Sequence, residues 1–139
     1  MPEALENKFQ FPIRVYYEDT DAGGIVYYAN YLKFFERART EWLRALDINQ
    51  SIFLEQSLGF VVRRVAMDNL ASARLDDLLN ITTQIKQLKK ASIVFQQTIT
   101  NEQAQTLCTV EVAVACVNFN SNKPCAIPQN ILGALKRVS

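Results

Sequence analysis

The stretch that decides the fold lies at residues 17–31 and reads Tyr17-Glu18-Asp19-Thr20-Asp21-Ala22-Gly23-Gly24-Ile25-Val26-Tyr27-Tyr28-Ala29-Asn30-Tyr31. It places three carboxylates within four residues, then two glycines, then an aromatic cluster that opens a long amphipathic segment. Acids crowded ahead of a helix start repel one another, which favours a use for at least one of them. The chain contains no histidine, so the commonest general base is missing. We therefore predict that any acid–base chemistry runs on a carboxylate, with Asp21 as the candidate.

The segment that follows has the period of a surface helix. We predict a helix from about Asn30, a good N-cap residue, to Leu46. Its apolar stripe comprises Tyr31, Phe34, Phe35, Ala38, Trp42, Ala45 and Leu46. On the polar side, Glu36 can pair with Arg39 and Glu41 with Arg44 at i,i+3 spacing, each pair stabilising by only a few tenths of a kcal/mol.

The remaining chain is typical of strands. Before the helix, Phe11–Tyr17 is a candidate strand; after it, Asn49 caps a second, short helix that ends before Gly59 in the helix-stop position. The later strand candidates are 60–67, 79–86, 92–99 and 107–119, joined by short connections that favour antiparallel hairpins. Pro128 begins a brief helical turn. One wide apolar helix stripe needs a sheet to lie on. We therefore predict an α+β fold, a curved antiparallel sheet of about five strands wrapped around one long central helix, in a single domain over residues 1–139.

Bulk properties exclude several classes of protein. The net charge of +1 argues against a dedicated nucleic-acid binder. Residues 1–7 show no pattern of a secretory leader, and the longest apolar run, residues 112–117, is too short to span a membrane. The three cysteines, Cys108, Cys116 and Cys125, are expected to be reduced and mostly buried, with no metal site, in a cytoplasmic protein.

The quoted stretch, with Phe34-Phe35-Glu36-Arg37-Ala38-Arg39 after it, resembles the hotdog-fold thioesterases. The similarity is to the 4-hydroxybenzoyl-CoA thioesterase-like branch, and within it to the acyl-CoA thioesterases associated with the Tol-Pal system. It extends over residues 13–119. The resemblance implies hydrolysis of an acyl-CoA thioester without a cofactor, in a homodimer or homotetramer whose CoA groove lies between subunits.

The resemblance also implies roles for particular residues. Asp21 matches the catalytic carboxylate, acting either as nucleophile on the thioester carbonyl or as base for water. Tyr28 matches the position at the helix start whose backbone N–H faces the thioester oxygen; many Tol-Pal-associated members carry histidine there. Tyr17 matches an aromatic residue that lines the acyl pocket.

Chemistry adds further candidates for substrate binding. Gly23 and Gly24 allow the backbone to approach a ligand closely because they have no Cβ. Free N–H groups at the helix start would stabilise negative charge on the thioester oxygen. Coenzyme A carries phosphates, and Lys89 and Lys90 on a hairpin turn, followed by Ser92, are the best local partners, with Arg63 and Arg64 as alternatives.

Several alternatives remain at this point. Asp21 could instead cap a turn or pair with Arg14. Tyr27 and Tyr31 are expected to pack in the core. A hotdog hydratase or dehydratase would need a histidine, which the chain lacks. A non-catalytic module that binds acyl-CoA or acyl carrier protein, linked to an envelope or lipid-synthesis complex, is the rival from another class.

Overall fold

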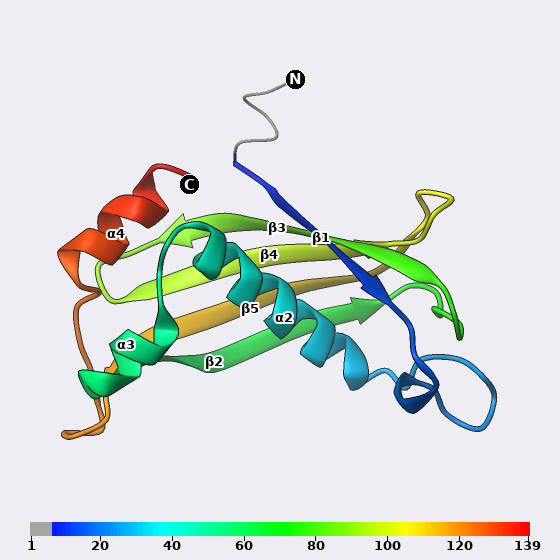
Figure 1. Cartoon of the computed structure of the whole chain (residues 1–139), viewed down its shortest axis with the longest axis horizontal. Coiled ribbons are helices and arrows are strands. Elements are labelled where there is room, and N and C mark those ends of the chain that lie inside the picture. The colour runs from blue at the N-terminus through cyan, green and yellow to red at the C-terminus, as the bar shows by residue number, and fades with distance from the viewer. Residues whose placement is uncertain (1–6) are drawn as a thin grey trace.

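A curled antiparallel sheet surrounds one long helix in the computed structural model, which describes residues 7–139 (Figure 1). The expectation about a leader falls almost wholly on residues 1–6, which lie outside the described residues. The elements are β1 (Phe9–Arg14), η1 (Tyr17–Asp19), α2 (Asn30–Ala45), α3 (Gln50–Glu55), β2 (Leu58–Asn69), β3 (Leu78–Leu88), β4 (Ser92–Thr100), β5 (Thr106–Asn118), β6 (Lys123–Pro124) and α4 (Gln129–Lys136). Within the described range no helix is both long enough and apolar enough to cross a membrane.

The sheet follows the order β1-β3-β4-β5-β2, with the two-residue β6 paired to the end of β5. Every pairing is antiparallel. Strands β3 and β4 alternate as predicted: the buried positions are Leu79, Ile81, Thr83, Ile93, Phe95, Gln97 and Ile99. The prediction of about five strands around one long helix is confirmed.

Helix α2 crosses the concave face of the sheet, as Figure 1 shows. Its buried residues are Tyr31, Phe34, Phe35, Ala38, Trp42 and Leu43. The C-terminal end of the predicted stripe was partly wrong: Ala45 is exposed and Leu46 is half-buried, whereas Leu43 faces the core because the helix ends there and turns toward α3. The Trp42 ring stacks on Phe9 of β1 at 6.1 Å between centroids and meets Phe95 of β4 edge-on at 6.4 Å. Apolar burial of this kind supplies most of the helix's stability, because a 16-residue helix is marginal by itself.

A buried polar cluster also joins α2 to the sheet. The amide of Gln97, which is fully buried, donates to the main-chain oxygen of Phe35 and to Oγ1 of Thr83, both at 2.9 Å. Its Oε1 accepts from Nη1 of Arg39 at 2.9 Å. Burial lowers the pKa of the Arg39 guanidinium from its ordinary value.

Of the two helix ion pairs predicted from spacing, one forms. Glu41 and Arg44 lie 2.6 Å apart, which confirms that pair. The pair of Glu36 with Arg39 is absent from the ion pairs of residues 7–139, so that prediction was wrong. The physical reason is that Arg39 turns inward to the Gln97 amide, whereas Glu36 stays exposed to solvent.

Helix α3 begins as predicted and ends differently. The Oδ1 of Asn49 accepts from the backbone N–H of Ser51 at 2.9 Å, which confirms the cap. Gly59 is not the helix stop: it lies inside β2, and Ser57 adopts the left-handed conformation instead, with φ of 61°. A Cβ on Gly59 would stand 2.6 Å from Cε2 of Phe119, so close packing explains this glycine.

Cys108 and Cys116 are buried, as expected, and none of the three cysteines is in a disulfide among the described residues. Burial raises the pKa of both Cys108 and Cys116 to about 12, which keeps these thiols protonated. Cys125 is half-buried, and its Sγ lies 3.5 Å from Sγ of Cys116 across the β5–β6 pairing.

Candidate active site

The acidic stretch forms a loop whose base is Asp19. Strand β1 ends at Arg14, earlier than the predicted Tyr17, because residues 17–19 turn into η1. The Asp19 side chain is buried, and its Oδ2 accepts from the backbone N–H of Tyr16 at 2.8 Å. Its main-chain oxygen accepts from the N–H of Tyr27 at 3.1 Å. Asp19 therefore ties the end of β1 to the residues that precede α2.

Asp21 lies in the loop itself, exposed to solvent. Its Oδ1 accepts from the backbone N–H of Gly23 at 2.8 Å, so Asp21 does cap this turn, through one of its two oxygens. The pairing with Arg14 was wrong, since Arg14 donates to the main-chain oxygen of Asp76 at 2.7 Å. Within residues 7–139, Oδ2 of Asp21 has no hydrogen-bond partner and the carboxylate forms no ion pair. One oxygen thus orients the group and the other is free to act.

The cap of α2 differs from the predicted one, whereas the N–H of Tyr28, named above from the resemblance, is free. Ala29, not Asn30, occupies the cap position, and Asn30 is the first residue of α2. Tight turns use the N–H groups of Asn30, Tyr31 and Leu32, which donate to the oxygens three residues earlier. Among the described residues, the N–H groups of Tyr28 and Ala29 donate no hydrogen bond. The available donors therefore stand just ahead of the helix.

Asp21 and Tyr28 line one open groove of about 500 Å³, which we call the tyrosine groove. Its lining comprises Asp21, Ile25, Val26, Tyr27, Tyr28, Tyr31, Asn69, Leu70, Ala71 and Ser72. The rings of Tyr27 and Tyr28 lie 5.1 Å apart and are each more than half exposed. The prediction that Tyr27 packs in the core was therefore wrong, whereas the burial of Tyr31 is confirmed.

Tyr31 links the groove to its far wall. Its hydroxyl accepts from the backbone N–H of Ala73 at 2.9 Å, and burial raises the pKa of the phenol. The N–H of Val26 donates to the oxygen of Ala73 at 2.9 Å. These bonds bring residues 69–72, at the end of β2, beside the loop. Sequence reasoning missed this wall, because a polar strand end carries no signal of which distant loop it meets.

The glycines of the loop occupy different environments. Gly24 has φ of +78°, the left-handed region that favours glycine. A Cβ on Gly23 would lie 3.3 Å from Oδ1 of Asp21. Both residues are thus needed for the shape of the loop that holds the carboxylate. Across residues 7–139, no cluster of three or more histidine, cysteine or acidic residues could hold a metal ion.

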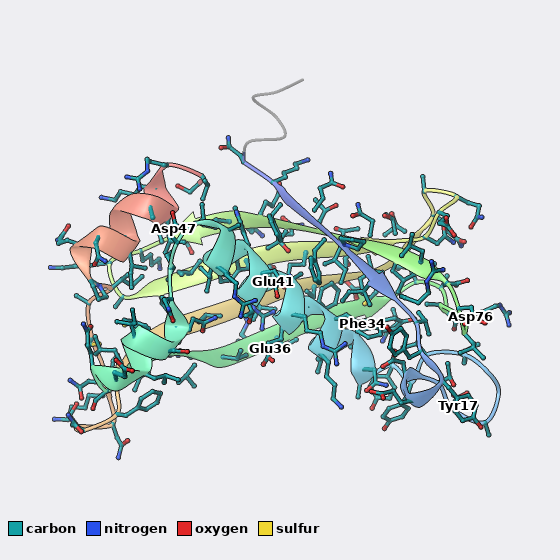
Figure 2. The ribbon with its side chains drawn as sticks, viewed as in Figure 1. Tyr17, Phe34, Glu36, Glu41, Asp47 and Asp76 are labelled. Carbon is teal, nitrogen blue, oxygen red and sulfur yellow. The ribbon has the colours of Figure 1, made fainter. Side chains whose placement is uncertain are left out.

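The other predicted binding residues lie outside the tyrosine groove of the same chain. Tyr17 is 83% exposed at the start of η1, at the outer end of the molecule (Figure 2). Lys89 and Lys90 are exposed on the β3–β4 hairpin, where the N–H of Lys89 donates to the oxygen of Ser92 at 2.8 Å. That hairpin and the Asp21 loop lie at opposite ends of the sheet (Figure 1). The alternatives Arg63 and Arg64 are exposed on β2.

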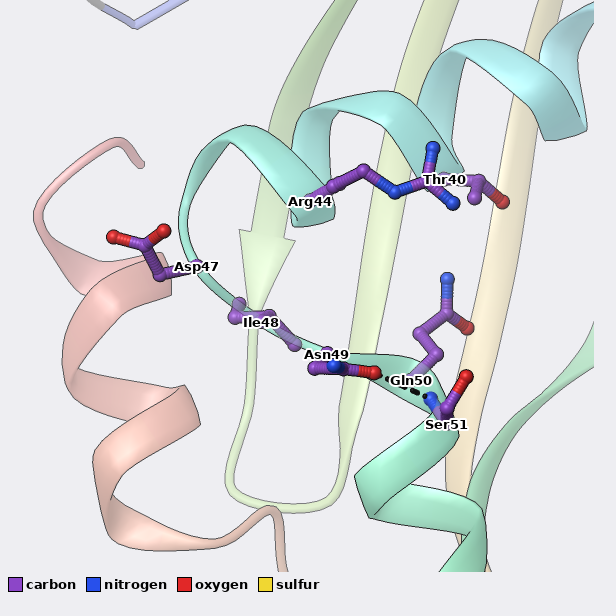
Figure 3. Close-up of a pocket in the computed structure, with 7 residues that line it drawn as sticks. All are labelled: Thr40, Arg44, Asp47, Ile48, Asn49, Gln50 and Ser51. Atoms are coloured by element: carbon purple, nitrogen blue, oxygen red, sulfur yellow. Dashed lines mark hydrogen bonds between the residues drawn. The ribbon is translucent and has the colours of Figure 1, made fainter.

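A second depression, of about 480 Å³, lies at the other end of α2, where the chain enters α3 (Figure 3). Its cationic side chain, Arg44, is already paired with Glu41, and the Asn49 side chain is engaged in capping α3. Its acid, Asp47, points away from the other lining residues in Figure 3. This depression lacks the combination of a free carboxylate and free amides that the tyrosine groove has.

Known proteins share both the sequence and this architecture. The family model of the thioesterase-like superfamily matches residues 15–135. The chain is 50% identical over 131 residues to the acyl-CoA thioesterase YbgC of Haemophilus influenzae, covering 94% of this chain and 96% of the relative. It is 46% identical over 129 residues to the acyl-CoA thioester hydrolase YbgC of Escherichia coli O6:H1, covering 93% and 96%. A crystal structure of a probable thioesterase from Bartonella henselae superposes with a TM-score of 0.82 at 37% identity, covering 87% and 99% of the two chains.

The fold and the matched family model define a hotdog-fold protein, and the chain belongs to the thioesterase-like superfamily. It is an enzyme, a thioester hydrolase. Within the superfamily, its similarity over nearly the whole chain is to the acyl-CoA thioesterases of the YbgC group.

Proposed function

We propose that the chain hydrolyses acyl-CoA thioesters in the tyrosine groove, with Asp21 as the catalytic carboxylate. The observation that carries this proposal is the presence, on one groove, of a carboxylate oxygen without a partner and of Tyr28, whose N–H is free. Acyl transfer needs a group to attack or activate water, and donors aimed at the oxygen that becomes negative. The Asp21 carboxylate can attack or activate water, and the Tyr28 N–H can donate to the oxygen.

Two routes balance. In the first, Asp21 takes a proton from water while the water oxygen bonds to the carbonyl carbon. The carbon–sulfur bond then breaks, and CoA leaves with the proton. In the second, the Asp21 oxygen itself bonds to the carbonyl carbon and expels the CoA thiolate, and water hydrolyses the resulting anhydride. In both, the N–H groups of Tyr28 and Ala29 hold the carbonyl oxygen as its charge grows.

The test is Asp21→Asn, which keeps the turn bond from Gly23 and removes the charge. We expect kcat on an acyl-CoA to fall by about 10²-fold or more, with the oligomer intact. A matched control is Asp47→Asn, since Asp47 is an exposed acid at the far end of α2 and asparagine tolerates its φ of 62°. A free-thiol assay follows release of CoA. Near-wild-type turnover by Asp21→Asn would remove the assignment.

The same assay tests the rival reading as a binding module. If a panel of aliphatic and aromatic acyl-CoAs, and acyl carrier protein carrying the same acyl groups, bound without releasing a thiol, the module would replace the hydrolase. The panel also identifies the acyl group. An association with the Tol-Pal system remains a proposal that rests on the family resemblance alone.

We further propose that the lysine hairpin, Lys89 and Lys90 with Ser92, binds the phosphates of CoA held at another copy's groove. Strand β3 separates the hairpin from the Asp21 loop, and its eleven residues extend over about 35 Å. The double variant Lys89→Ala with Lys90→Ala should raise KM at low salt, less so at high salt, with kcat kept. Lys123→Ala with Lys136→Ala removes the same charge elsewhere as a control. An unchanged KM at low salt would eliminate the hairpin.

A further inference from the structure

The side chain of Asn30 has no part in the two routes above and does not line the tyrosine groove, yet it bonds to the base of the loop that carries Asp21. Its Nδ2 donates to the main-chain oxygen of Asp19 at 3.0 Å, across eleven residues of chain. An asparagine at the N-cap position accepts from N–H groups of its own helix, as Asn49 does for α3, whereas Asn30 is the first residue of α2 and follows the cap position. Asn30 donates outward instead. Its side chain therefore serves the loop and not the helix.

The oxygen that Asn30 contacts is shared. The same Asp19 main-chain oxygen accepts from the N–H of Tyr27 at 3.1 Å. Asp19 is itself only 7% exposed, and its carboxylate is held by the N–H of Tyr16. The oxygen is thus a fixed point, anchored to the end of β1.

The Asp21 carboxylate and the N–H groups of Tyr28 and Ala29, which act on the thioester in the proposed routes, both lie close in sequence to residues bonded at this oxygen. Asp21 follows Asp19 by two residues, and the free N–H groups of Tyr28 and Ala29 lie between Tyr27 and Asn30. Without the Asn30 bond, the Asp19 oxygen would accept, among the described residues, from the Tyr27 N–H alone. A displacement of about 1 Å between reacting groups can reduce a rate by about 10²-fold.

We propose that Asn30 is a positioning residue, whose hydrogen bond to the Asp19 main-chain oxygen fixes the separation between the Asp21 carboxylate and the N–H groups of Tyr28 and Ala29. The inference rests on the proposed function, in which these groups act on the same thioester. It adds a residue that touches neither the substrate nor the reacting atoms.

The experiment compares Asn30→Ala and Asn30→Asp with matched changes at Asn49. Asn30→Asp keeps the shape, removes both N–H donors and puts a negative charge at a helix start, where it favours the helix. We expect both Asn30 variants to lower kcat about 10-fold or more while KM stays within about twofold. Amide exchange of the peptide that contains Tyr27 should quicken. Asn49→Asp, which keeps its acceptor, should match the wild type, and Asn49→Ala should lose stability but keep kcat.

The outcomes separate the positioning role of Asn30 from the proposed catalytic role of Asp21. If Asp21→Asn abolishes turnover while both Asn30 variants keep wild-type kcat, the positioning role is overturned and the proposed function stands. If Asp21→Asn keeps turnover, both fail together, whatever the Asn30 variants do. If Asn49→Ala loses as much kcat as Asn30→Ala for the same loss of melting temperature, Asn30 is merely structural, which also overturns the inference.

Discussion

Two adjacent glycines in the active-site loop owe their place to different physical requirements. Gly24 has φ of +78° and no heavy atom within 4 Å of the position its Cβ would occupy, so conformation alone requires a glycine. Gly23 lacks the positive φ, but its Cβ would stand 3.3 Å from Oδ1 of Asp21. Gly24 therefore avoids backbone strain, and Gly23 leaves room for the Asp21 side chain.

This difference predicts opposite phenotypes for two alanine substitutions. Gly24→Ala should cost about 1–2 kcal/mol of stability, since a left-handed alanine is strained, and should keep most of kcat. Gly23→Ala should change the melting temperature little and lower kcat, because the new methyl group pushes the carboxylate by a few tenths of an ångström. Thermal unfolding and steady-state kinetics on both proteins decide the matter. Equal losses of stability in the two variants would contradict this account.

At the scale of elements, α2 is seated on the sheet by polar as well as apolar contacts. The Gln97 side chain of β4 satisfies the Phe35 oxygen of the helix, Thr83 of β3 and Arg39 of the helix. A buried polar group without a partner is costly, so rotation of α2 that broke this cluster would be penalised. The cluster thereby fixes which face of the helix meets the sheet.

Gln97→Leu tests whether this hydrogen-bond cluster fixes α2 on the sheet. The substitution leaves the Arg39 guanidinium without its partner and removes both amide donors, so we expect a loss of about 2–4 kcal/mol. Gln96→Leu, an exposed glutamine one position away on the same strand, should change stability by less than about 0.5 kcal/mol. Chemical denaturation measures both. A small loss in Gln97→Leu would mean that apolar packing alone seats the helix.

Element types were predictable where the signal is local. The α2 stripe, the alternation in β3 and β4 and the Asn49 cap each depend on residues a few positions apart. The last two were confirmed, and the stripe was confirmed from Tyr31 to Trp42 but not at Ala45. The predictions were wrong where a contact with a residue distant in the sequence determined the local structure. Arg39 met Gln97 from β4 rather than Glu36, and Gly59 was required by Phe119, not by the end of α3.

The site was predictable for a similar reason and to a similar extent. Asp21, Tyr28 and the glycines lie within eight residues, so one motif contains them all. The wall formed by residues 69–72 and the hydrogen bond from Asn30 to Asp19 depend on tertiary pairing, for which the sequence has no local signature. The Tyr27 ring was misplaced because an aromatic beside a helix stripe can face either way.

At the scale of the whole molecule, the two edge strands of the described sheet, β2 and β1, differ in length and composition. Strand β2 forms one edge over twelve residues, and Val61, Val62 and Val65 on it are each at least 40% exposed. The opposite edge, β1, has six residues and includes Pro12, which has no N–H to donate. A twelve-residue edge strand with three exposed valines can pair with another chain, although Arg63 and Arg64 lie between those valines. We therefore propose that two copies associate through β2, about a two-fold axis.

The variant Val61→Lys with Val65→Lys tests this association, because charges on an edge strand oppose pairing. We expect its mass in solution, measured by light scattering after size-exclusion chromatography, to fall to that of a single chain. Gln10→Lys, on the exposed face of β1, is the control and should keep the wild-type mass. A wild-type protein that is itself a single chain would contradict the proposal.

The placement of the lysine hairpin and the Asp21 loop at opposite ends of β3 has a genetic consequence. If the hairpin of one copy binds CoA at the groove of another, as proposed, each substrate-binding unit draws on two polypeptides. An allele encoding Asp21→Asn would then lower kcat through one half of the unit, and one encoding Lys89→Ala with Lys90→Ala would raise KM through the other. Co-expressed in one cell, the two alleles should complement each other, since one composite unit in each mixed pair inherits both intact halves.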